Sequence, residues 1–284
     1  MTRKRIEWKL KDRSLVLGER TLIVGVLNVA PDATSDGGRY QEPDVAYSRA
    51  LEIEDMGADI LAVAAESMRA GSARVSEGEE IRGLIPVMKK LEGKLRIPVC
   101  VSTYKAAVAD RSLELGAEII SDPSGLTFDP ALAKVVVKHD AGLVLTHMRG
   151  APETWGRLGP VPDVLNLVGS ELQASVHRTI RAGVNKSQIV VDPGLGFGKR
   201  KEQNTELLAR LPELEKLGMP IMIGPSGKVF LAKPNEREAP GAMAAAVAAA
   251  VLGGAHLVRL HDVKEFKSAV QLADALVAAR PELD

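Results

Sequence analysis

An aspartate and a glycine-rich turn meet at one point of the sequence that is well suited to catalysis. The apolar run Gln188–Asp192 ends in the aspartate, and the turn that follows contains Phe197. Parallel α/β barrels present catalytic groups in this way, at the ends of buried strands. Because an unpaired buried carboxylate is costly, an inward Asp192 indicates a polar partner or ligand at that strand end.

Basic side chains at other strand ends are suited to binding an anion. Arg259 and His261 end the last apolar run, and positions i and i+2 of a strand face the same side. Arg69 lies in the loop after the run Asp59–Ala64, and a guanidinium binds phosphate through two hydrogen bonds. The alternatives are a structural ion-pair cluster of Arg259 and His261 with Asp262, and a solvated Arg69.

The single cysteine favours a packing role over a nucleophilic one. Cys100 precedes Ser102 by two positions, so both are expected to face the interior. A nucleophilic cysteine needs a positioned base and a lowered pKa, and the sequence shows no partner for it. The five histidines lack the spacing of zinc ligands.

Composition excludes several classes of function. The chain has 284 residues, no net charge, 45% hydrophobic residues and 3% aromatic residues, which indicates an aliphatic core and no binding of nucleic acid. No apolar run reaches the roughly 18 residues that cross a membrane. The basic start lacks the apolar segment of a secretory signal, and one cysteine fits a reducing compartment. We therefore expect a cytoplasmic α/β protein with no membrane partner.

Short apolar runs alternate with helix-period segments, which predicts a parallel sheet covered by helices. The expected strands are Leu22–Asn28, Asp59–Ala64, Pro98–Ser102, Glu118–Ser121, Gly142–His147, Gln188–Asp192, Pro220–Gly224 and His256–Leu260. The expected helices include Pro43–Met56, Glu77–Leu91, Lys105–Leu115, Glu202–Leu217 and Ala242–Leu252.

These eight units predict a (β/α)8 TIM barrel that forms one domain over residues 1–284. The alternative is an open doubly wound sheet, but no Gly-x-Gly-x-x-Gly follows the first strand. Two short strands around the turn at Asp12–Arg13 predict a hairpin within residues 1–20. We expect it to cover the bottom of the barrel, with Trp8 as its anchor.

The chain resembles the dihydropteroate synthases, pterin-binding barrel enzymes of folate biosynthesis. The string Ile189–Leu208 is similar to the motif on the family's sixth strand, and six further segments support the resemblance. It implies a transferase that joins 6-hydroxymethyl-7,8-dihydropterin pyrophosphate to p-aminobenzoate. It also implies a magnesium ion (Mg2+) as cofactor and a homodimer.

The resemblance assigns roles to residues that match the family's motifs. Asp192 and Lys228 are expected to hold the pterin and to pair with each other, with Met148 packed on the pterin face. Asn28 is expected to bind Mg2+ and the pyrophosphate. The catalytic residues carried over are Asp192, Lys228, Arg259 and His261; the substrate-binding residues are Asn28, Arg69, Ser102, Ser121, Met148, Phe197 and Ser226; the metal ligand is Asn28.

Several pocket positions depart from the family pattern. Ser102 stands where the family has aspartate, Ser121 where it has asparagine, Gly227 where it has arginine, and Met68 where it has threonine. A serine has a single hydroxyl and cannot reproduce the two-point acceptance of a carboxylate. The changes predict a larger and less polar pocket.

Two alternatives to the synthase reaction follow from these departures. One is a natural or engineered barrel repurposed for another small molecule, with Lys228 in a less polar pocket as an amine nucleophile. The other is a non-catalytic pterin-binding paralogue that keeps the fold.

Overall fold

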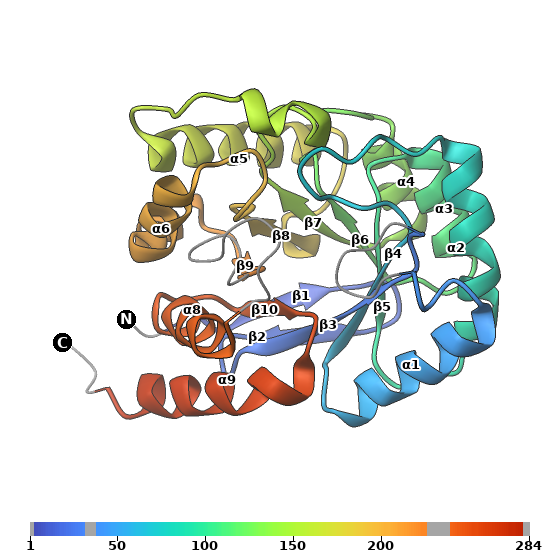
Figure 1. Cartoon of the computed structure of the whole chain (residues 1–284), viewed down its shortest axis with the longest axis horizontal. Helices are drawn as coiled ribbons and strands as arrows, with labels where there is room; N and C mark the ends of the chain where they lie inside the picture. Colours follow the sequence, from blue (N-terminus) through green and yellow to red (C-terminus); the bar gives the residue numbers. More distant parts are fainter. Residues whose placement is uncertain (1–2, 32–37, 226–238, 281–284) are drawn as a thin grey trace.

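The computed structural model describes residues 3–31, 38–225 and 239–280, and within these ranges the main sheet has eight parallel strands (Figure 1). They are β3 (Leu22–Asn28), β4 (Ile60–Ala64), β5 (Val99–Ser102), β6 (Ile119–Asp122), β7 (Gly142–Thr146), β8 (Ile189–Asp192), β9 (Met222–Ile223) and β10 (Leu257–Leu260). The order is β8-β7-β6-β5-β4-β3-β10-β9, and an isolated parallel bridge from Val191 to Ile221 joins its two ends. The predicted barrel is confirmed.

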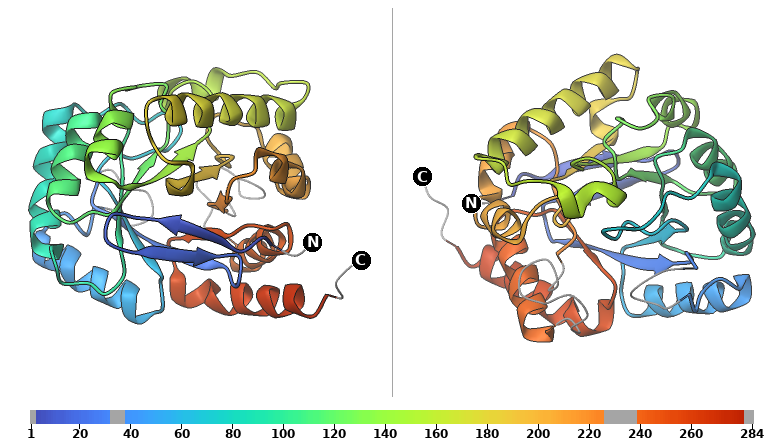
Figure 2. Two further views of the ribbon diagram at one scale, coloured as in Figure 1. Left: turned by 180° about the vertical axis from the view of Figure 1, so that it is seen from behind. Right: turned by 45° about the horizontal axis from the view of Figure 1, so that its top comes forward.

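Helices surround the barrel on its outer side (Figures 1 and 2). They are α1 (Pro43–Asp55), α2 (Glu77–Leu91), α3 (Ala106–Glu114), α4 (Leu132–His139), α5 (Val164–Arg181), α6 (Lys201–Ala209), α8 (Pro240–Leu252) and α9 (Val263–Ala278). Among the described residues, no helix is long and apolar enough to cross a membrane.

One expected helix is divided. The range Glu202–Leu217 contains α6 and then the 3-10 helix η3 (Leu211–Leu217). Pro212 lies at the start of η3, and proline has no N–H for an α-helical hydrogen bond and restricts the residue before it. The α-helix therefore ends before this proline and the chain continues as a tighter turn.

The predicted N-terminal hairpin is present as β1 (Ile6–Lys9) and β2 (Ser14–Leu17), and it lies across one end of the barrel (Figure 2). Trp8 is only 1% exposed, and its Nε1 donates to the backbone oxygen of Gln188 at 2.8 Å. Residues of the hairpin and inward residues of the strands form one apolar cluster: Trp8, Leu10, Leu17, Leu22, Val24, Ile60, Ala62, Cys100, Ile119, Val144, Val190, Met222 and Leu257.

The alternation of side chains along a strand also shows which side chains face the interior at the other end of the barrel. Cys100, Ile119 and Val190 belong to the interior cluster, and side chains two positions further along a strand face the same way. Ser102, Ser121 and Asp192 therefore face the interior at the carboxyl ends of their strands. The single-domain organisation over residues 1–284 stays a prediction.

Candidate active site

The residues expected to bind substrate gather at the carboxyl ends of the strands. Asn28 of β3 lies opposite Ala64, Ala64 opposite Ser102 of β5, and Ser102 opposite Ser121 of β6. Asp192 of β8 lies opposite Thr146 on the other side of this layer. The sheet register thus brings four predicted positions, Asn28, Ser102, Ser121 and Asp192, to one end of the barrel.

Asp192 is a fully buried carboxylate of this layer. Its Oδ1 accepts a hydrogen bond from the N–H of Gly194 at 2.8 Å. Oδ2 lies 3.6 Å from Nη2 of Arg259, an ion pair beyond hydrogen-bond distance. Burial raises the pKa of Asp192 above its usual value, and the nearby Arg259 opposes that shift.

Near their carboxyl ends, three neighbouring strands carry buried polar atoms that lack a hydrogen-bond partner among the described residues. Ser121 Oγ, Thr146 Oγ1 and Asp192 Oδ2 are buried and make no hydrogen bond of good geometry with any residue that the structure describes. Buried polar atoms are almost always hydrogen-bonded, because leaving one unsatisfied costs roughly 1–3 kcal/mol. A polar ligand that reached this layer would satisfy them.

Arg259 fills the space above Asp192. Its guanidinium lies 5.9 Å from the centre of the Phe197 ring, and that ring packs on Trp155 at 5.4 Å. A Cβ on Gly224 would come within 2.9 Å of the arginine Nη2, so the glycine leaves the room that the guanidinium occupies. The structure therefore brings Asp192, Arg259 and Phe197 together, as the sequence predicted for one site.

The turn after β8 is held tightly to the end of β7. Gly194 has φ of +67°, and a Cβ there would come within 2.0 Å of the His147 carbonyl oxygen, so only glycine fits. Lys199 is 8% exposed, and its Nζ donates to the carbonyl oxygens of His147, Gly194 and Phe197 at 2.8–3.3 Å. Burial lowers the pKa of Lys199 to about 7, against the attraction of Asp192.

A small cavity of about 260 Å³ lies beside the end of β7. Met148, half-buried, lines it together with Thr146, His147 and Arg178. His147 Nε2 is 3.0 Å from Glu171 Oε2, but burial lowers the pKa of His147 to about 4. The histidine is therefore neutral near pH 7 and adds no cation to the site.

A larger cavity of about 560 Å³ lies at the other end of the barrel. It is lined by Arg3 and Ile6 near the hairpin and by Ile221 and His256, which precede or begin the last strands. None of the expected site residues lines it. The polar strand ends therefore mark the candidate active site, although a larger cavity lies elsewhere.

Comparison with known proteins supports the family resemblance seen in the sequence. The family model of the pterin binding enzymes matches residues 24–261. A dihydropteroate synthase of Synechocystis sp. is 38% identical over 91% of both chains, and one of Clostridium beijerinckii is 38% identical over 95% of this chain and 99% of the relative. The chain belongs to the dihydropteroate synthase family.

Solved structures of the family confirm the barrel. A Yersinia pestis dihydropteroate synthase with a sulfonamide drug complex superposes with a TM-score of 0.90, at 32% identity over 96% of this chain and 100% of that one. A Burkholderia cenocepacia enzyme complexed with 7,8-dihydropteroate gives 0.83, at 33% identity over 97% and 98%. The predicted reaction class, a transferase of the dihydropteroate synthase type, is confirmed, and nothing in these matches favours a repurposed or non-catalytic barrel.

Some of the expected site residues are exposed, and others lie outside the described residues. Arg69 is exposed on the loop between β4 and α2, and His261 is exposed just after β10. Ser226, Gly227 and Lys228 lie outside the described residues, so the pairing of Lys228 with Asp192 stays a prediction.

Two features of this dihydropteroate synthase fold were missed in the sequence. The sequence places Lys199 directly after the glycine-rich turn but does not show that its ammonium holds three carbonyl oxygens. The ion pairs of Lys105 with Glu66 and Glu80 join three different elements. A lysine directly after a glycine turn was the only available signal for the first, and nothing in the local sequence signalled the second.

Proposed function

We propose that this barrel binds a pterin pyrophosphate and p-aminobenzoate, joins them, and releases pyrophosphate. The observation that carries the proposal is Asp192, fully buried at an inward strand end with Oδ2 free of hydrogen bonds to described residues and Arg259 beside it. A pterin presents paired N–H donors on its amino-pyrimidine edge, which match an acceptor oxygen at this position. The relative solved with 7,8-dihydropteroate supports this substrate class.

The reaction needs positioning and charge stabilisation more than acid–base chemistry. The amine nitrogen of p-aminobenzoate attacks the exocyclic methylene carbon of the pterin, and the C–O bond to pyrophosphate breaks. The leaving pyrophosphate takes the bonding electron pair, and the new C–N group loses a proton to water. Arg69, Arg259 and His261 would bind the leaving group, whose growing charge they stabilise.

Asn28 fits the magnesium site that the family implies. Its Oδ1 accepts one hydrogen bond from Ala30 N at 3.0 Å, and a carbonyl-type oxygen keeps a second lone pair for a cation. No set of three or more His, Cys, Asp or Glu side chains within the described ranges is arranged to hold a metal. This suits Mg2+, which takes one or two protein oxygens and completes its shell with phosphate and water. When bound, the ion would neutralise charge on the leaving pyrophosphate.

The pocket is altered at Ser102 and Ser121, and we expect weaker pterin binding as a result. Ser121 Oγ is buried and unpartnered among the described residues, so it offers the pterin one hydroxyl where the family has an amide. Loss of a hydrogen-bonded charged partner costs about 2–5 kcal/mol in comparable complexes.

We also place the reaction in the cytoplasm and expect a homodimer through the outer helices. The alanine-rich helix α8 packs against α9, whose Leu272 and Leu276 are 65% and 51% exposed. Exposed leucines on a helix that already has one packed face support an interface. Sedimentation of the purified chain tests it, and a monomer at micromolar concentration would contradict it.

The first experiment is a calorimetric titration with 6-hydroxymethyl-7,8-dihydropterin pyrophosphate and Mg2+, followed by a pyrophosphate assay on addition of p-aminobenzoate. We expect binding in the micromolar range and release of one pyrophosphate per coupled product. Absence of binding at millimolar ligand would contradict the proposed function, and the barrel would then be tested with other substrates.

A further inference from the structure

The loop that joins β4 to α2, residues 65–76, is closed by one carboxylate. Glu66 Oε1 accepts a hydrogen bond from Val75 N at 3.2 Å, which brings the first and last parts of the loop together. Arg69 lies between these two points, and its carbonyl oxygen accepts from Ser72 Oγ at 2.8 Å. The position of Arg69 therefore depends on where Glu66 is held.

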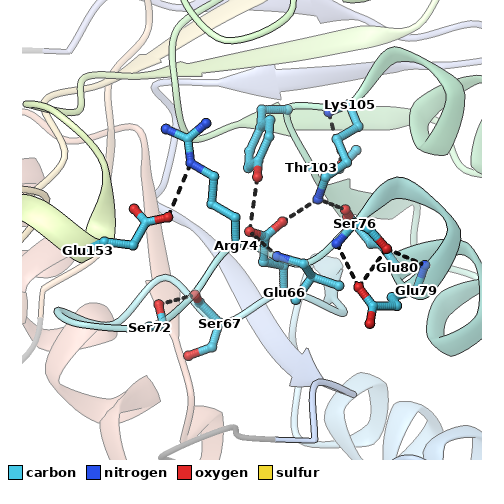
Figure 3. Close-up of polar contacts among 12 residues, drawn as sticks. Glu66, Ser67, Ser72, Arg74, Ser76, Glu79, Glu80, Thr103, Lys105 and Glu153 are labelled. Carbon is cyan, nitrogen blue, oxygen red and sulfur yellow. Dashed lines mark hydrogen bonds and ion pairs between the residues drawn. The ribbon is translucent and has the colours of Figure 1, made fainter.

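Glu66 is held by two consecutive residues of the segment after β5, and one of them also binds α2 (Figure 3). Tyr104 OH donates to Glu66 Oε1 at 3.0 Å, and Lys105 Nζ pairs with Glu66 Oε2 and also with Glu80 Oε2 of α2. The side chains of Lys105, Glu66 and Glu80 are 12%, 5% and 0% exposed. This buried triad fixes the start of the loop to the segment after β5 and to the first turn of α2.

The triad contributes geometry more than stability. Burial lowers the pKa of Lys105, but its bonds to Glu66 and Glu80 outweigh that effect and raise it, so the ammonium stays charged. Burial raises the pKa of Glu80. Buried ion pairs gain little over apolar side chains of the same shape, because desolvation offsets their attraction. The main effect of the triad is therefore to fix the position of the loop.

The far side of the same loop is fixed to the segment after β7. Gly71 N donates to the Pro152 carbonyl oxygen at 2.9 Å, and Arg74 Nε lies 3.4 Å from Glu153 Oε1. The Arg74 guanidinium also lies 4.2 Å from the centre of the Phe128 ring. The loop is thus anchored at both sides, by Glu66 at one and by Arg74 at the other (Figure 3).

We propose that Glu66, clamped by Lys105, is a positioning residue that holds Arg69 where the pyrophosphate group of the substrate binds. The inference rests on the proposed function, since it assumes a pyrophosphate-bearing substrate. Glu66 touches no reacting atom; it acts through the loop. Its loss should therefore weaken binding of the pyrophosphate group and leave the binding of p-aminobenzoate unchanged.

Kinetics of Glu66→Gln separate these effects. Glutamine keeps the size of the side chain and an acceptor for Val75 N, but it loses the ion pair with Lys105. We expect KM for the pterin pyrophosphate to rise about tenfold, as for the loss of one charge-assisted contact, with kcat and KM for p-aminobenzoate within about twofold. Lys105→Met, which keeps Glu66 but removes its clamp, should give the same pattern. An unchanged KM in both folded variants would overturn the proposal.

A double-mutant cycle tests whether Glu66 acts through Arg69. Arg69→Met should raise the same KM, and Glu66→Gln should add no further loss in that background, because coupled residues are not additive. A further tenfold loss in the Arg69→Met background would show that Glu66 acts on something else and would overturn the proposal.

Hydrogen exchange gives a readout that does not depend on turnover. Backbone amides of residues 67–75 should exchange faster in Glu66→Gln and in Lys105→Met. Lys138→Met is the matched control: it removes a lysine paired with Asp110 at 2.7 Å, away from this loop, and should change neither exchange nor KM. An inactive wild-type protein would contradict the proposed function alone, whereas unchanged exchange in Glu66→Gln would contradict the positioning role itself.

Discussion

The two ends of this barrel are built from the same strands but in opposite ways. At the amino ends, the inward side chains are apolar and pack on the hairpin, with Trp8 1% exposed. At the carboxyl ends, the inward side chains are polar, and Ser121, Thr146 and Asp192 each keep an atom with no hydrogen-bond partner in the described part of the chain. If the carboxyl ends bind the substrate as we propose, stability and ligand binding are divided along each strand, within a few residues of one another.

The largest effect should come from the apolar end. Trp8→Ala removes a fully packed indole and its hydrogen bond to the Gln188 carbonyl, so we expect a loss of about 3–5 kcal/mol in the free energy of unfolding. KM for both substrates should change less than about twofold at a temperature where the variant is folded. Urea denaturation and steady-state kinetics measure the two quantities. A large change in KM without loss of stability would show that the two ends are not separate.

The second-largest effect should come from the polar end, and it should lower activity without lowering stability. Asp192→Asn keeps the shape of the side chain but removes the charged acceptor. We expect the transition-state stabilisation measured by kcat/KM to weaken by about 2–5 kcal/mol. Stability should not fall at neutral pH, because burial raises the pKa of Asp192 and the charged form is costly. Pyrophosphate release and urea denaturation test both statements.

Asp122 provides the control for this change. It is also a fully buried carboxylate at a strand end, but its oxygens accept from the Ser124 and Leu126 N–H groups at 2.7 and 2.6 Å. Asp122→Asn should therefore lower stability and leave pterin affinity nearly unchanged. If both aspartates gave the same result, the inward position of Asp192 would have no special role.

Restoring polar groups at the carboxyl end should strengthen the contrast. Ser121→Asn and Ser102→Asp place an amide and a carboxylate on two paired strand ends. We expect pterin affinity to rise by about 1–3 kcal/mol for the pair, as for added hydrogen bonds to a buried ligand. Calorimetric titration measures this gain, and a gain in pyrophosphate release should accompany it. No gain in either would indicate a pocket with another ligand.

The smallest effect is a pH dependence at the same end. The pKa of Lys199 is lowered to about 7 in the folded protein from its ordinary value of 10.5, so the unfolded chain binds more protons between these values. The free energy of unfolding should therefore rise with pH, by about 1 kcal/mol between pH 7 and 8. Lys199→Met should remove this rise, and urea denaturation at several pH values compares the two proteins. An identical slope in both would contradict a lowered pKa.

Much of the fold could be predicted because buried parallel strands leave a strong local signal. Apolar runs such as Val99–Ser102 are buried on both faces, and their ends were placed within about two residues. The split at Pro212 was also available in the sequence, but the helical period on both sides obscured it.

The site could be predicted only where position along a strand decides direction. Ser102, Ser121 and Asp192 follow inward apolar residues by two positions, so their gathering at one end was predictable. The contacts of Lys199 and of Glu66 with Lys105 join segments whose approach depends on the closed barrel. No local pattern encodes such contacts.

The hairpin at the bottom of the barrel also determines that one folding step, the burial of Trp8, comes late. Trp8 leaves the ribosome early, but its hydrogen-bond acceptor is 180 residues away along the chain, and Leu257 of the same apolar cluster comes later still. The indole therefore becomes buried only when nearly all of the chain has been synthesised. Contacts of such long sequence separation slow folding. Burial of Trp8 is thus one of the closing steps of barrel assembly.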